Sequence, residues 1–228
     1  MYWENIVFDA ESPKQQGEFW EVLLKCQMLT DNADGYETRL QLAGPRYLDL
    51  CFPAVRDPDR AQQRVHLILG SGTHFSERLG DGHPDAMESR LDAAGNEFLL
   101  RAHDQDASGL VLEALQLACI DPAGDAEFWK QLLGWDIVAR SPAVLAHPSG
   151  AGPRLVLVRE ASPKTAGKNA IHLDLRLEQA ESMEDALGII CALGGKELDP
   201  PWGTLPWRVF QDRSGNEFCV LAPSASNR

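Results

Sequence analysis

Residues 168–177, KNAIHLDLRL, bring together three side chains that could do chemistry. His172, Asp174 and Arg176 alternate with isoleucine and leucine, and alternate residues of a β-strand point to opposite faces of the sheet. We therefore expect a strand with one apolar face and one polar face. An imidazole, a carboxylate and a guanidinium on one face could hold a metal ion, move a proton or bind a polar ligand. A polar ladder of mutually paired side chains is the structural alternative.

Cys219, near the end of the chain, is a second candidate for chemistry. A thiol close to a histidine can act as a thiolate nucleophile, so His172 and Cys219 form a candidate catalytic pair. The sequence supplies no third group to orient them, which favours Cys219 as a small buried residue. For His172, the alternatives are a histidine that pairs with Asp174 or with the backbone, and a histidine that contacts a ligand.

An aromatic segment precedes the last predicted strands. Residues 197–212, ELDPPWGTLPWRVFQD, carry Trp202 and Trp207 among three prolines. Tryptophans in a stiff loop often line a pocket for an apolar or planar ligand, or else cover the core of their own domain. Arg208 could bind an anionic group of such a ligand. We expect the nearby Lys164 and Lys168 to lie at the solvated surface.

The chain repeats itself. A Phe-Trp pair, a Pro-Arg pair, a His-Leu pair and the tetrapeptide Gly-Asn-Glu-Phe recur in the same order in the two halves. We predict two domains, residues 1–106 and 110–228, separated by the polar stretch 103–109. The second copy is complete. The first has a loop-like segment, GSGTHFSERLGDGHPD, where the second has an amphipathic helix, so we regard the first domain as degenerate.

The pattern of each copy predicts its elements. A short β-type run ends at Ser12-Pro13 or at Asp121-Pro122, which is typical of a helix start. Gly134 sits where a glycine would end the second helix. Three strands follow, and then the strand that carries the histidine. The copies thus read as tandem βαβββ units of an α+β fold, with curved sheets, helices outside and concave inner faces where ligands can sit.

Composition excludes several classes of function. The 228 residues carry a formal net charge of −13 and no cluster of lysine and arginine, which disfavours nucleic acid and anionic membranes as partners. The five cysteines are odd in number and form no CxxC pair, which disfavours a disulfide scaffold. Without a signal-like or membrane-spanning stretch, we expect a cytoplasmic protein.

The motifs of the second half resemble a known superfamily. FWKQLLGW, GPRLVLVREASPKTAGKNAIHLDLR and DRSGNEFCVL are similar to the glyoxalase-like branch of the vicinal oxygen chelate superfamily. This superfamily includes glyoxalase I, the bleomycin and fosfomycin resistance proteins and the extradiol dioxygenases. The first half keeps FWEVLL, GPRYLDLCF, VHL and AAGNEF, which is a weaker match.

The resemblance implies where a metal would lie. Enzymes of this superfamily hold a divalent metal with His, Gln or Glu from four strand positions. In the second half these positions correspond to Ala114, about Leu157, His172 and Cys219. In the first half they correspond to Asn5, about Asp49, His66 and Leu99. Neither set is a complete group of nitrogen and oxygen ligands, so we expect no metal or other cofactor. Asn5, Asp49 and His66 remain the alternative metal ligands.

We therefore predict a protein that binds a small organic molecule in the concave sheet of the second domain. The expected ligand contacts are His172, Asp174, Arg176, Trp202, Trp207 and Arg208. The alternative is a lyase, isomerase or dioxygenase-type enzyme that uses a metal or His172. For the degenerate first domain, we expect a structural role: it would pack against the second domain or support a homodimer.

Overall fold

The computed structural model describes residues 1–228 except 60–61, 72–86, 102–108, 161–162, 201–204 and 225–228. The first half contains β1 (Tyr2–Phe8), α1 (Pro13–Leu24), β2 (Gln27–Asn32), β3 (Gly35–Gln41), β4 (Tyr47–Pro53), β5 (Val65–Gly70), β6 (Met87–Leu91) and β7 (Glu97–Arg101). The second half contains β8 (Val111–Cys119), α3 (Pro122–Leu133), β9 (Asp136–Arg140), β10 (Ala143–Ala146), β11 (Arg154–Arg159), β12 (Ile171–Arg176), α4 (Met183–Ala192), β13 (Lys196–Leu198), β14 (Trp207–Gln211) and β15 (Glu217–Leu221).

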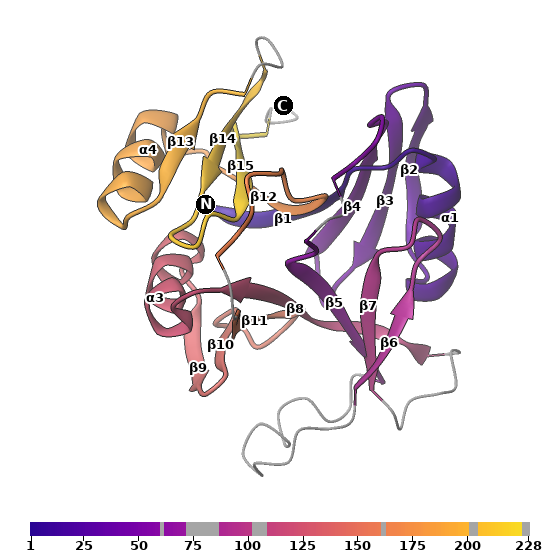
Figure 1. Cartoon of the computed structure of the whole chain (residues 1–228), viewed down its shortest axis with the longest axis horizontal. Helices are drawn as coiled ribbons and strands as arrows, with labels where there is room; N and C mark the ends of the chain where they lie inside the picture. Colours follow the sequence, from indigo (N-terminus) through magenta and orange to yellow (C-terminus); the bar gives the residue numbers. More distant parts are fainter. Residues whose placement is uncertain (60–61, 72–86, 102–108, 161–162, 201–204, 225–228) are drawn as a thin grey trace.

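The strands form two mixed sheets (Figure 1). The larger sheet has the order β13-β14-β15-β12-β1-β4-β3-β2, and the smaller sheet has the order β6-β7-β5-β8-β11-β10-β9. The α+β class and the curved sheets predicted from the sequence are confirmed. Each sheet, however, joins strands of both halves, through the antiparallel pairs β1–β12 and β5–β8. Neither sheet is the product of one sequence repeat.

The helices begin and end as their sequences predict. Proline occupies the first turn of α1 and of α3, where its missing N–H leaves no hydrogen bond unmade. Gly134 ends α3 with a φ of 64°, a left-handed conformation that glycine adopts without steric cost. The helix predicted only in the second half is α4, which begins after Ser182, whose side chain accepts a hydrogen bond from the backbone N–H of Asp185.

Equivalent aromatic contacts hold each repeat together across the two sheets. Trp20 of α1 packs against Phe98 of β7, with ring centroids 5.4 Å apart. Trp129 of α3 packs against Phe218 of β15 at 5.2 Å. Each helix therefore links the two parts of its own repeat, although these parts belong to different sheets.

The smaller sheet has an apolar face opposite the main core. Ile68, Ala114, Val144 and Val156 form a separate buried cluster there. These side chains offer no group for acid–base or ligand chemistry. None of the described helices has both the length and the apolar character needed to cross a membrane.

Candidate functional site

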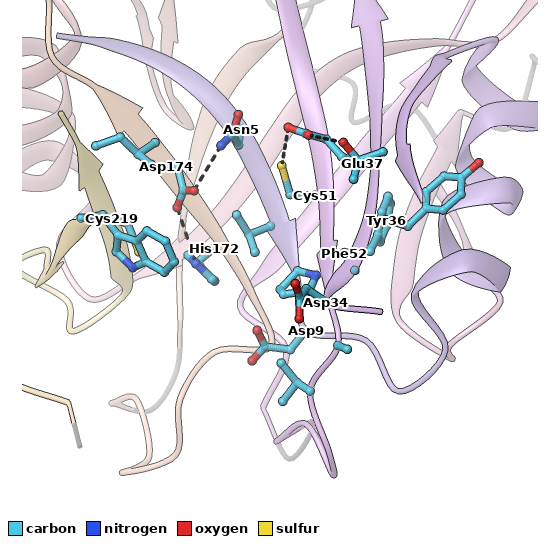
Figure 2. Close-up of a pocket in the computed structure, with 18 of the residues that line it drawn as sticks. Asn5, Asp9, Asp34, Tyr36, Glu37, Cys51, Phe52, His172, Asp174 and Cys219 are labelled. Carbon is cyan, nitrogen blue, oxygen red and sulfur yellow. Dashed lines mark hydrogen bonds and ion pairs between the residues drawn. The ribbon is translucent and has the colours of Figure 1, made fainter. Parts of the chain in front are cut away.

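A cavity of about 760 Å³ lies against the larger sheet. Its walls come from β1, β2, β3 and β4 of the first half and from β12, β14 and β15 of the second (Figure 2). We expected the second half alone to build this cup, and the strand order corrects that expectation. The physical reason is the pairing of β1 with β12, which brings the polar faces of the two halves into one sheet.

The strand register regroups the positions derived from the superfamily. Asn5 of β1 pairs with Asp49 of β4 and with Asp174 of β12, and Asp174 pairs with Cys219 of β15. Asn5, Asp49, His172 and Cys219 therefore share the larger sheet. The other four positions, His66, Leu99, Ala114 and Leu157, lie in the smaller sheet.

Three buried side chains meet at the floor of the cavity. His172, Asp174 and Cys219 are 7%, 8% and 5% exposed, and each has a potential ligand atom within 4.8 Å of the others. Asn5 Nδ2 donates to Asp174 Oδ2 at 3.2 Å. Among the described residues, His172 Nδ1 and Asp174 Oδ1 have no hydrogen-bond partner. His172 Nε2 lies 3.6 Å from Asp174 Oδ1, which is too long for a good hydrogen bond. Buried polar atoms without partners are expensive, so this floor favours a bound polar group.

Burial decides the protonation of these groups. It lowers the pKa of His172 well below its usual value, and the charge of Lys168 acts in the same direction. It raises the pKa of Asp174 to about 6. Burial, then the charge of Asp174 and a hydrogen bond to it, raises the pKa of Cys219 far above the usual value for a thiol. At neutral pH the site holds a neutral imidazole, a mostly ionised carboxylate and a thiol. A reactive thiolate at Cys219 is therefore disfavoured.

The four positions derived from the superfamily do not fit a divalent metal. Arg39 binds both carboxylate oxygens of Asp49, at 2.8 and 2.7 Å, so this carboxylate is already neutralised. Asn5 directs its amide nitrogen toward Asp174, and a nitrogen that carries protons is no ligand. The different set His172, Asp174 and Cys219 offers one nitrogen, one oxygen and one sulfur, which is a donor set suited to Zn²⁺.

The other predicted ligand contacts are dispersed. Trp207 lines the cavity. The Arg176 Nε donates to a carboxylate oxygen of Glu4 at 2.5 Å. Arg208 points away from the cavity, where Glu197 and Glu184 bind its guanidinium. His66 belongs to the smaller sheet, 3.6 Å from Glu97. Trp202 lies outside the described residues.

Sequence reasoning missed several cavity residues. Cys51 of β4 points into the cavity, and its Sγ lies 3.6 Å from Glu37 Oε1 of β3 (Figure 2). The alternation of RYLDLCF places Cys51 on the same face as Asp49, which is a signal that could have found it. Lys168, expected at the solvated surface, instead forms an ion pair with Asp9 at the cavity wall.

Comparisons with known proteins agree with this architecture. Residues 114–221 match the family described as glyoxalase-like domain. Glyoxalase I from Zea mays superposes with a TM-score of 0.62 at 16% identity, over 97% of this chain and 92% of that chain. A putative dioxygenase from Bacillus subtilis superposes with a TM-score of 0.59 at 13% identity, over 99% of this chain and 86% of that chain. No curated protein sequence matches the chain.

These matches cover different shares of the chain. Residues 114–221 match the glyoxalase-like domain family, and the whole chain shares its fold with glyoxalase I from Zea mays. At such low identities the solved structures establish the fold alone. The activity has to be argued from the site itself.

Proposed function

We propose that this protein binds a small organic molecule in the cavity of the larger sheet. The observation that carries the proposal is the contrast between floor and walls. The floor holds buried polar atoms of His172 and Asp174 that lack partners. The walls include the side chains of Val7, Val209 and Trp207. Apolar walls with a few convergent polar groups are typical of sites for small molecules, and about 760 Å³ lies in their size range.

A ligand screen with a blocked cavity tests the proposal. Planar and apolar metabolites would be screened by thermal shift against the full chain and against a Val7→Trp variant, whose larger side chain fills the cavity. A ligand at about 100 times its Kd stabilises the folded state by about 2.7 kcal/mol, so hits raise the Tm of the wild type. We expect the same compounds to leave the Tm of Val7→Trp unchanged.

The matched control is Val138→Trp, the same substitution at an exposed position of β9 in the smaller sheet. This variant should respond to the hits as the wild type does. Circular dichroism of both variants checks that they fold. Hits that stabilise Val7→Trp as strongly as the wild type would place the binding site elsewhere and refute the proposal.

A second candidate function is that of an enzyme of the lyase, isomerase or dioxygenase type that depends on a metal. The observation that favours it is the buried group His172, Asp174 and Cys219, whose donor atoms lie within 4.8 Å of one another. A bound divalent metal would supply a Lewis acid there. The chain's own residues would then have to exclude water and position the substrate against the apolar wall.

Metal analysis separates the two candidates. Protein purified without chelator should contain about one equivalent of metal if the second candidate holds, and less than about a tenth of an equivalent if it does not. Added Co²⁺ gives an independent readout, because a cobalt–thiolate bond produces a charge-transfer absorption. Loss of that absorption in Cys219→Ser would assign the metal to this site, and its absence from the wild type would exclude it.

A further inference from the structure

The cavity contains more acidic than basic side chains. The carboxylates that line it are Asp9, Asp34, Glu37, Asp174 and Glu217, and the basic residues that line it are Arg56 and Lys168. This imbalance is local and separate from the net charge of the chain, because it counts only residues that line one cavity.

Ion pairs neutralise two of these carboxylates. Lys168 pairs with Asp9. Lys164 Nζ lies 2.8 Å from Glu217 Oε1, and both side chains are 7% exposed. Asp34 and Arg56 are exposed residues of opposite charge. In the described part of the chain, Asp174 and Glu37 are therefore the inner carboxylates without a lysine or arginine partner.

Neutral groups lie between Asp174 and Glu37. Figure 2 shows Asn5 and Cys51 between them, with Asn5 bonded to Asp174 and Cys51 in contact with Glu37. Burial, and then the charges of Glu37, Asp174 and Asp49, raises the pKa of the Cys51 thiol. Arg39 neutralises Asp49, so Glu37 and Asp174 carry the negative charge at this part of the cavity, on either side of Cys51.

Asp174 is the group that most needs a positive partner. The residue is 8% exposed, and its Oδ1 has no hydrogen-bond partner among the described residues. The adjacent His172 does not supply a positive charge, because burial keeps its imidazole neutral. The charge of Lys168 favours the ionised form of Asp174, but Lys168 forms its ion pair with Asp9. A buried carboxylate without a cation in direct contact is unfavourable unless a bound group provides the charge.

We infer that the small molecule bound in this cavity carries a positively charged amine that pairs with Asp174 and lies within reach of Glu37. The inference rests on the proposed function and narrows its ligand class to organic cations with an apolar body. Val7, Val209 and Trp207 would contact that body. A metal ion could supply the same charge, so the experiment includes arms that distinguish the two sources.

The test compares three probes that share one planar ring and differ in charge. Tryptamine is a cation, tryptophol is neutral and indole-3-acetate is an anion. Each is titrated into the ¹⁵N-labelled full chain and followed by NMR, with EDTA present. We expect tryptamine to bind about 10- to 100-fold more tightly than tryptophol, and indole-3-acetate to bind most weakly.

Salt separates a contact inside the cavity from general attraction. The chain carries a net charge of −13, which attracts any cation weakly from a distance. Raising the salt from about 0.15 M to about 0.5 M screens that long-range attraction but has much less effect on a buried pair. The preference for tryptamine over tryptophol should therefore persist at the higher salt.

Variants assign the preference to named residues. Asp174→Asn should abolish the preference for tryptamine while tryptophol still binds within about threefold of the wild type. Glu37→Gln should reduce the preference for tryptamine over tryptophol by a smaller factor. This variant provides an independent test if Asp174→Asn folds poorly. Asp136→Asn is the matched control, since it removes one exposed carboxylate of β9 far from the cavity lining. This variant should bind all three probes with the affinities of the wild type.

The outcomes distinguish this inference from the proposed function. If no probe binds, the cation inference fails, and the thermal-shift screen with Val7→Trp decides separately whether the cavity binds small molecules. Binding of all three probes with similar affinity, or a preference for the anion, overturns the cation inference and leaves small-molecule binding in place. The inference is also overturned if Zn²⁺ added without EDTA binds through Asp174 while tryptamine shows no advantage over tryptophol.

Discussion

Asp174 is a carboxylate that the fold buries at a cost. Its neighbours on β12 face the main core, where Leu173 and Leu175 are buried, so the alternation of the strand forces Asp174 to the cavity side. There its carboxylate accepts a hydrogen bond from Asn5 and interacts with the Cys219 thiol. These interactions do not offset the loss of hydration, which is why its pKa rises.

This burial predicts how stability depends on pH. The pKa of Asp174 is about 6 in the folded chain, against an ordinary value of 3.8. The folded state therefore holds the proton more tightly than the unfolded state. The stabilisation is present at low pH and is lost as the pH rises from about 4 through about 6. Asp174→Asn, which stays neutral, should raise the free energy of unfolding at pH 7 by up to about 3 kcal/mol.

Urea unfolding at a series of pH values measures this effect. The difference between Asp174→Asn and the wild type should shrink toward zero near pH 4, where the wild-type carboxyl is protonated in the folded chain. Asp136→Asn, at an exposed position, serves as the control and should follow the wild type at every pH. A constant difference between Asp174→Asn and the wild type across the range would contradict the burial argument.

At the scale of elements, helix α1 supports the cavity from behind. Its Gly17 lies against Tyr36 of β3, and Tyr36 lines the cavity. A Cβ placed at Gly17 would lie 2.1 Å from Tyr36 Cδ1. The absence of a side chain therefore lets the helix approach the sheet closely and fixes the position of the tyrosine ring.

Two glycine substitutions should have opposite effects. Gly17→Ala should destabilise the chain by about 1 to 3 kcal/mol, because the overpacking against Tyr36 outweighs the gain in helix propensity. Gly188→Ala in α4, where nothing lies within 4 Å of the added Cβ, should stabilise by about 0.5 to 1 kcal/mol. Thermal unfolding of both variants measures whether each substitution lowers or raises the stability. A stabilised Gly17→Ala would show that the contact with Tyr36 relaxes freely.

At the scale of the whole molecule, the two halves together provide one polar cavity. The larger sheet collects Asn5 and Cys51 from the first half and His172 and Cys219 from the second. The equivalent positions of the smaller sheet are His66, Leu99, Ala114 and Leu157, of which only His66 is polar. The first half therefore contributes to the candidate site despite its degenerate sequence, since its β1 and β4 form part of the cavity wall.

This arrangement predicts the behaviour of the isolated second half. A fragment of residues 110–228 lacks β1 and β5 and exposes the edges of β12 and β8, together with apolar side chains such as Leu173 and Leu115. Exposed edges of this kind pair with other chains. We expect the fragment to aggregate or to dimerise through these edges, as measured by light scattering and circular dichroism. A folded monomer would show that β12 and β8 do not need their partners.

Local sequence determined the elements and the faces of their side chains. Proline set the start of α1 and of α3, and glycine set the end of α3. Alternation placed His172 and Asp174 on one face of β12. These features depend on neighbours along the chain. The repeat was visible in the sequence itself, and the glyoxalase-like fold was predicted from the resemblance of its motifs to a known superfamily.

The tertiary structure alone decided which halves share a site. Strand partners are chosen by packing over the whole chain, so the sequence could not show that β1 pairs with β12 instead of each half closing its own sheet. Nor could it show that Arg39 neutralises Asp49 while Asp174 keeps an oxygen without a partner. These contacts depend on distances between segments that lie far apart in sequence, which local patterns along the chain do not contain.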